Sequence, residues 1–100
     1  MTQREFFFLK LMEEAAEVQH RISKLLQFGN DEIGPSQDET NEERLQGEII
    51  DLLAILKMLE DRGFLFPVVA EFQEQAIILK ERKVLDFMAH SITLGTVDPA

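Results

Sequence analysis

Carboxylates at helical spacing are the residues of this chain best suited to do chemistry. Glu14 and Glu17 are three residues apart, and Glu48 and Asp51 repeat that spacing further along the chain. In an α-helix, residues three apart are neighbours on one face, about 5–6 Å apart at Cβ, so like charges there repel each other. The segment 48–59, EIIDLLAILKML, is otherwise almost entirely apolar. An ionised carboxylate in such surroundings needs a positive or hydrogen-bonding partner.

Two long helices are predicted to carry these acidic pairs. The first begins at Thr2, which opens a capping-box pattern, and ends at Gly29. The second begins at Thr40, which opens another such pattern, and ends at Gly63. Apolar residues at alternating spacings of three and four are typical of helices in a bundle. The stripe expected on the first helix is Phe8, Leu11, Ala15, Val18, Ile22 and Leu25, and that on the second is Leu45, Ile49, Leu52, Leu56 and Leu59.

Antiparallel packing of these helices, with each acidic pair about midway along its helix, would bring the four carboxylates face to face. Four carboxylates around a shared space cannot all stay ionised without cations. Oxygen ligands with no Cys or His among them favour magnesium or manganese over zinc. The sequence therefore predicts a divalent-metal site formed by Glu14, Glu17, Glu48 and Asp51.

Two other interpretations of the acids stay open. Lys10 with Glu14, and Glu17 with Arg21, are spaced as i, i+4 ion pairs, which would leave these acids on a solvated surface. The chain would then be a non-catalytic helical interaction module in which acids make inter-helix salt bridges. Glu17 and His20 also form one half of a di-iron bundle motif. The sequence holds no second Glu-x-x-His, which disfavours a redox bundle.

The connection between the two helices is a loop over residues 30–40. Six acids and no base lie between Asp31 and Glu43, so this segment is expected to be solvated. Helix–helix connections in bundles usually take about 2–8 residues. The longer connection leaves room for a lid over a ligand, or is a tolerated surface insertion.

A third helix is predicted from Pro67, which suits a first helical position, to about Ala89. Its apolar stripe contains Val69, Phe72, Ala76 and Leu79, and a basic cluster of Lys80, Arg82 and Lys83 follows. Residues 1–90 are expected to form one helical domain, and residues 91–100, without helical signal, a C-terminal tail.

The fold class expected is all-α. A chain of 100 residues buries only roughly 60–65% of the surface that it exposes when unfolded. With 45% hydrophobic residues, three helices alone would leave apolar faces uncovered. We therefore expect three main helices that form a four-helix-bundle-type core through homo-oligomerisation, as a homodimer or homotetramer.

Composition restricts the partners and the location. The net charge of −9 argues against nucleic-acid polymers and anionic membranes as partners. The chain has no cysteine, so disulfides and thiolate chemistry are excluded. The longest uncharged apolar run, residues 64–70, contains Pro67 and is too short to span a bilayer. No secretory signal opens the sequence, and a cytoplasmic location is expected.

The acidic motifs resemble those of a known family. EEAAE at 13–17 and EIID at 48–51 match the E-E-x-x-E … E-x-x-D signature of the MazG-like all-α nucleoside triphosphate pyrophosphohydrolases. The flanking FG after the first helix and LQGEIIDLLAILKML on the second are also similar to that family. The resemblance covers roughly residues 5–62.

This resemblance implies magnesium-dependent cleavage of a nucleoside or deoxynucleoside triphosphate to the monophosphate and pyrophosphate. It implies that Glu13 acts as a base behind the metal ligands or as an extra ligand. It also implies that Lys80, Arg82 and Lys83 contact substrate phosphates. The related phosphoribosyl-ATP pyrophosphatases have similar acids and remain a variant of the same interpretation.

Overall fold

The computed structural model describes residues 1–67 and 73–100, which contain three helices and no strand. The helices are α1 (Gln3–Phe28), α2 (Asn41–Asp61) and α3 (Glu74–Thr93). The predicted all-α class is confirmed for this part of the chain. None of the described helices is long and apolar enough to cross a membrane. The chain divides into two compact units, Met1–Phe66 and Pro67–Ala100.

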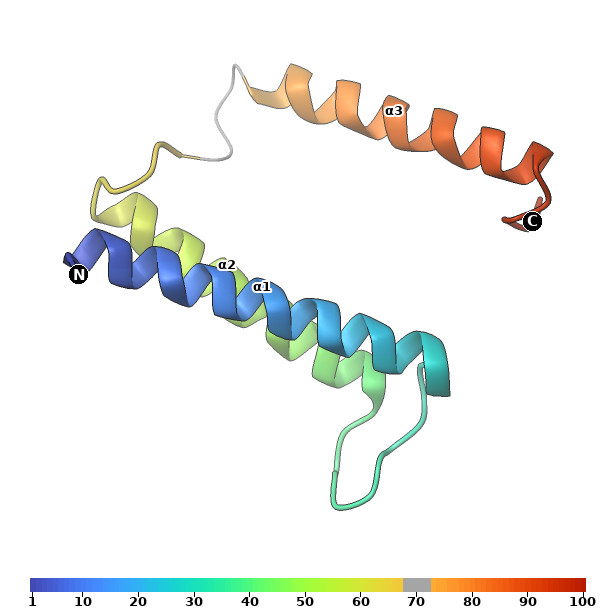
Figure 1. Cartoon of the computed structure of the whole chain (residues 1–100), viewed down its shortest axis with the longest axis horizontal. Coiled ribbons are helices and arrows are strands. Elements are labelled where there is room, and N and C mark those ends of the chain that lie inside the picture. Colours follow the sequence, from blue (N-terminus) through green and yellow to red (C-terminus); the bar gives the residue numbers. More distant parts are fainter. Residues whose placement is uncertain (68–72) are drawn as a thin grey trace. The chain divides into compact units, whose positions relative to one another are not determined.

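Helices α1 and α2 pack side by side and antiparallel (Figure 1). At one end, Asn41 Nδ2 donates a hydrogen bond of 2.9 Å to the carbonyl oxygen of Gly29. At the other end, Arg4 Nε donates one of 3.2 Å to the carbonyl oxygen of Phe64. The start of each helix therefore lies beside the end of the other, as the metal-site prediction requires.

Three of the predicted helix ends are confirmed by their hydrogen bonds, and α2 ends at Asp61, two residues before the predicted Gly63. Thr2 Oγ1 accepts a hydrogen bond from the backbone N–H of Glu5, at 3.1 Å. Thr40 and Glu43 make a complete capping box, with hydrogen bonds of 3.1 and 3.0 Å, and the bond from the Thr40 backbone lowers the pKa of Glu43. Gly29 ends α1 with a backbone φ of 93°, a value that residues other than glycine rarely adopt.

The end of the pair where α1 begins is apolar, and we call it the apolar end (Phe7, Leu59 and Phe64). Leu59 is fully buried, with none of its surface exposed. The rings of Phe7 and Phe64 lie 6.2 Å apart, and the guanidinium of Arg62 lies 4.7 Å from the centre of the Phe7 ring. Burial of such side chains is the main source of stability in a pair of helices.

Two residues of the predicted stripes were placed wrongly. Ile22 is 42% and Ile49 is 40% exposed, whereas the adjacent Arg21 is only 7% exposed and the adjacent Glu48 is half-buried. Spacings of three and four allow the stripe to pass through either of two adjacent residues in each turn. Apolarity favoured the isoleucines, but the observed packing turns the polar residues toward the seam between α1 and α2.

The segment 48–59 is less buried than its composition predicts. Ile50 and Leu53 are more than half exposed, and Asp51 is exposed rather than enclosed by apolar neighbours. Within the described part of Met1–Phe66, α1 is the helix that packs on α2, and one neighbour covers only one face.

In the second unit, the prediction for the third helix was partly wrong. Pro67 is not helical, and Val69 and Phe72 of the predicted stripe lie outside the described residues. At its other end α3 runs on to Thr93, past the predicted stop at Ala89. The helix ends only where Gly95 takes a positive φ of 77°, and the predicted tail is correspondingly shorter.

Candidate functional site

Three carboxylates from the two helices converge on the seam. Glu14 of α1 and Glu48 and Asp51 of α2 each place one oxygen within 4.8 Å of the oxygens of the other two. Glu14 and Glu48 are half-buried, and Asp51 is exposed. We call these residues the acidic cluster. Antiparallel packing therefore brings together three of the four predicted metal ligands.

None of these three carboxylates forms a hydrogen bond or ion pair in the described part of the chain. The ion pair expected between Lys10 and Glu14 does not form, because Lys10 binds Glu13 instead, at 3.1 Å. The expected pair of Glu17 with Arg21 is also absent from the described residues, since Arg21 turns into the helix seam. Local ion pairs therefore do not account for the position of Glu14.

The electrostatics of the acidic cluster are those of crowded anions. Burial raises the pKa of Glu14, and the charges of Asp51, Glu48, Glu17 and Glu13 raise it further, in that order. Both causes disfavour the ionised form, so Glu14 holds a proton at a pH where an isolated glutamate would lose it. A bound cation would reverse this effect, because it stabilises the ionised carboxylate.

The donor set of the acidic cluster fits a hard divalent cation. Magnesium binds oxygen ligands at about 2.0–2.1 Å, so two oxygens on one ion lie at most about 4.2 Å apart. The observed limit of 4.8 Å lies just beyond this span, within reach of small side-chain rotations. Three carboxylates leave further coordination positions for water or for substrate oxygens.

Glu17 and Glu13 lie outside the acidic cluster. The side chain of Glu17 is exposed, although its charge still acts on Glu14. Glu13 is exposed and paired with Lys10. The roles predicted for these two residues, metal ligand and base, stay predictions.

The predicted phosphate-binding residues lie on α3, in the second unit. Lys80, Arg82 and Lys83 are all exposed. The Lys83 ammonium lies 5.9 Å from the centre of the Phe87 ring. Their contact with a substrate stays a prediction.

Sequence reasoning missed two polar residues that the structure buries. Arg21 was read only as a partner for Glu17, and Asn41 was not considered, yet Asn41 is 3% exposed. Arg21 stands three residues after Val18 and four before Leu25, so it falls on the apolar stripe. A charged residue at a stripe position was the signal that would have identified it.

The chain was compared with protein-family models, with curated proteins and with solved structures. None of them matches. The resemblance of its acidic motifs to the MazG-like family therefore stays a prediction, and the geometry of the acidic cluster carries the functional argument.

Proposed function

We propose that this chain is a magnesium-dependent hydrolase that cleaves a nucleoside or deoxynucleoside triphosphate to the monophosphate and pyrophosphate. The observation that carries the proposal is the acidic cluster of Glu14, Glu48 and Asp51, which lies within 4.8 Å and lacks a cationic partner among the described residues. A chain of net charge −9 binds a polyphosphate only where cations intervene. The reaction itself is suggested by the resemblance of residues 13–17 and 48–51 to the MazG-like motifs.

The proposed roles follow from position. Glu14, Glu48 and Asp51 would hold the metal, and Glu17 would join them by turning inward. Magnesium, when bound, neutralises phosphate charge and lowers the pKa of an attacking water. Glu13, on the neighbouring position of α1, would orient that water and accept its proton, or serve as an extra ligand.

Self-association is part of the proposal. Large apolar side chains of α1 and α2 face outward, among them Met12, Leu26, Ile50 and Leu53, each more than half exposed. Two copies of the α1–α2 pair, packed through these faces, would form a four-helix-bundle-type core in a homodimer or homotetramer. Lys80, Arg82 and Lys83 would then contact substrate phosphates, and the enzyme would act in the cytoplasm.

A non-catalytic interaction module is the second candidate, favoured by the same exposed apolar side chains. The two candidates differ in what the acidic cluster is for. In an interaction module, carboxylates that repel each other without a cationic partner would only destabilise the fold. A hydrolase needs them for its metal.

A product assay tests the proposal. We expect a panel of eight nucleoside and deoxynucleoside triphosphates, incubated with magnesium, to include at least one that yields pyrophosphate. Orthophosphate as the sole product, or hydrolysis that persists in EDTA, would contradict the proposal. Glu48→Gln should lower the rate at least about 100-fold, since groups that stabilise transition-state charge contribute effects of that order. Glu39→Gln, which removes an exposed carboxylate from the loop, should leave the rate unchanged.

A further inference from the structure

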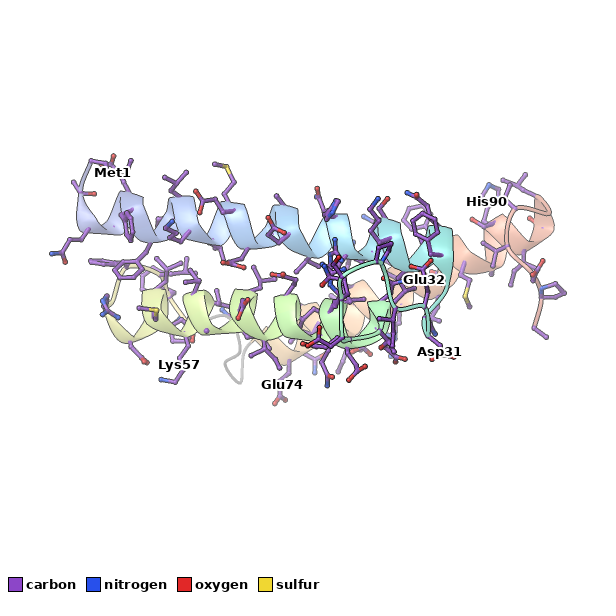
Figure 2. All side chains as sticks on the ribbon, turned by 90° about the horizontal axis from the view of Figure 1, so that it is seen from below. Met1, Asp31, Glu32, Lys57, Glu74 and His90 are labelled. Atoms are coloured by element: carbon purple, nitrogen blue, oxygen red, sulfur yellow. The ribbon has the colours of Figure 1, made fainter. Side chains whose placement is uncertain are left out.

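A second polar site lies at the loop end of the α1–α2 pair, where the chain around Asp31 and Glu32 joins the helices (Figure 2). A cavity of about 200 Å³ is lined there by Arg21, Lys24 and Arg44, together with Asn41 and Glu32. We call the three cations the basic pocket. One carboxylate among three cations makes this place positive in a strongly acidic chain.

Arg21 is the unusual member of the basic pocket. Its side chain is more than nine-tenths buried, and its Nη1 has no hydrogen-bond partner. A buried charge without a partner is unfavourable, and a buried donor left unpaired in a native protein calls for a ligand or water that satisfies it. Arg21 and Arg44 form no ion pair in the described residues. A guanidinium matches the geometry of phosphate oxygens and can donate two hydrogen bonds to them at once.

The wall of the cavity is built by the loop, and Asn41 fixes that loop. Its Nδ2 donates hydrogen bonds to the carbonyl oxygen of Gly29, at 2.9 Å, and to Glu32 Oε1, at 3.3 Å. Backbone hydrogen bonds of 3.0 and 3.1 Å join Asn41 to Glu32 and Glu42 to Asn30. The hydrogen bond from Asn41 engages the one carboxylate of the cavity. The pocket is therefore formed before any ligand arrives.

The basic pocket and the acidic cluster lie on the same faces of α1 and α2, two helical turns apart. Arg21 follows Glu14 by seven residues on α1, and Arg44 precedes Asp51 by seven on α2. Seven residues are two helical turns, about 10.5 Å, and return the side chain to nearly the same face. Because the helices are antiparallel, both arginines lie on the same side of the acidic cluster, toward the loop. One elongated anion could therefore contact the basic side chains at one end and a metal ion held by the acidic cluster at the other.

We infer that Arg21, Lys24 and Arg44 bind the terminal phosphate groups of the proposed substrate, the end released as pyrophosphate. This inference rests on the proposed function for the identity of the ligand. It assigns to the α1–α2 unit a phosphate-binding role that the sequence prediction gave to Lys80, Arg82 and Lys83. The loop over residues 30–40 then acts as the wall of a substrate pocket.

Calorimetric titration with inorganic pyrophosphate tests the inference, once with magnesium and once in EDTA. Arg21→Gln and Arg44→Gln should each weaken pyrophosphate binding at least about tenfold, the loss expected for a charged hydrogen bond. Lys57→Gln is the matched control, because it removes an equal charge from an exposed position of α2 at the apolar end (Figure 2). Circular dichroism checks that each variant is folded, and Arg44, half-buried, keeps the test valid should Arg21→Gln not fold.

The outcomes separate this inference from the proposed function. Unchanged pyrophosphate affinity in folded Arg21→Gln and Arg44→Gln overturns the basic pocket, even where the protein hydrolyses triphosphates. Binding in EDTA that is lost in both variants supports the pocket, even where magnesium has no effect and hydrolysis is absent. A raised KM for the triphosphate in both variants, with Lys57→Gln unchanged, shows that the nucleotide's own phosphates occupy the pocket. An effect on pyrophosphate alone assigns the pocket to a free anion and overturns the substrate role.

Discussion

The two ends of the α1–α2 pair differ in the side chains that fill the seam between the helices. At the apolar end, Leu59 is fully buried and the rings of Phe7 and Phe64 pack together. From the middle of the pair toward the loop, the seam contains Glu14 and then Arg21, charges without partners in the described residues. The first arrangement is what stability favours. The second is unfavourable without a ligand, and unfavourable polar placements are typical of functional sites.

The largest difference in stability should appear when a side chain of the apolar end and one of the acidic cluster are each truncated to alanine. Leu59→Ala is expected to lower the free energy of unfolding by about 2–5 kcal/mol, because it leaves a cavity in the only fully buried position described. Glu48→Ala should leave the metal-free protein as stable as before or more so, since it relieves repulsion. Urea denaturation of both variants measures this. A loss of about 3–5 kcal/mol in Glu48→Ala would instead reveal a salt-bridged acid.

Magnesium should stabilise the part of the seam that holds the acidic cluster, and so reduce its difference from the apolar end. A ligand that binds only the folded state stabilises it by mass action, by about 2.7 kcal/mol at one hundred times its dissociation constant. We therefore expect millimolar magnesium to raise the melting temperature of the protein but not that of Glu48→Ala. Thermal unfolding followed by circular dichroism, with and without EDTA, is the measurement. A melting curve that magnesium leaves unchanged would argue strongly against the metal site.

The helix caps should respond more weakly. Thr40→Ala removes a complete capping box at the loop end and should cost about 1 kcal/mol. Thr2→Ala removes the hydrogen bond that the backbone N–H of Glu5 donates to Thr2 Oγ1 at the apolar end, and it should cost no more than that. Urea denaturation compares the two variants. A larger loss for Thr2→Ala than for Thr40→Ala would contradict this ranking of the two caps.

The smallest effect concerns the pH dependence of stability. Because the pKa of Glu14 is raised in the folded protein, its favourable contribution is present below the ordinary value of 4.5 and is lost as the pH rises through the folded pKa. Without metal, Glu14→Gln should therefore gain stability relative to the unsubstituted protein as the pH rises from about 4.5 toward neutrality. Saturating magnesium should reverse the trend. Parallel denaturation curves at several pH values provide the check.

Much of the α1–α2 pair could be predicted from the sequence. Thr2, Thr40 and Gly29 are strong local signals, because each acts through its own backbone neighbours. The pairing of Glu14 with Glu48 and Asp51 followed from helical spacing and antiparallel packing alone. The choice between Ile22 and Arg21 did not, since it depends on the rotation of one helix against the other. That rotation is a tertiary property, which local spacing leaves open.

The prediction for the third helix failed for a different reason. The apolar residues of α3 have no regular stripe to mark its ends, and Pro67 suits a loop as well as a first helical turn. Its end depends on Gly95, six residues past the expected stop at Ala89. The basic pocket was missed because nothing in the sequence around Arg44 and Lys24 distinguishes them from ordinary surface residues. Only the loop that packs beside them makes them part of a cavity.

Helix α3 has no buried residue among those that the structure describes. An isolated helix of 20 residues gains little from its own hydrogen bonds and is only marginally stable in water. Its stability would then depend on a partner that covers its exposed leucine and valine side chains. If that cover is a second copy of the chain, α3 unravels on dilution, and the melting temperature becomes a function of protein concentration.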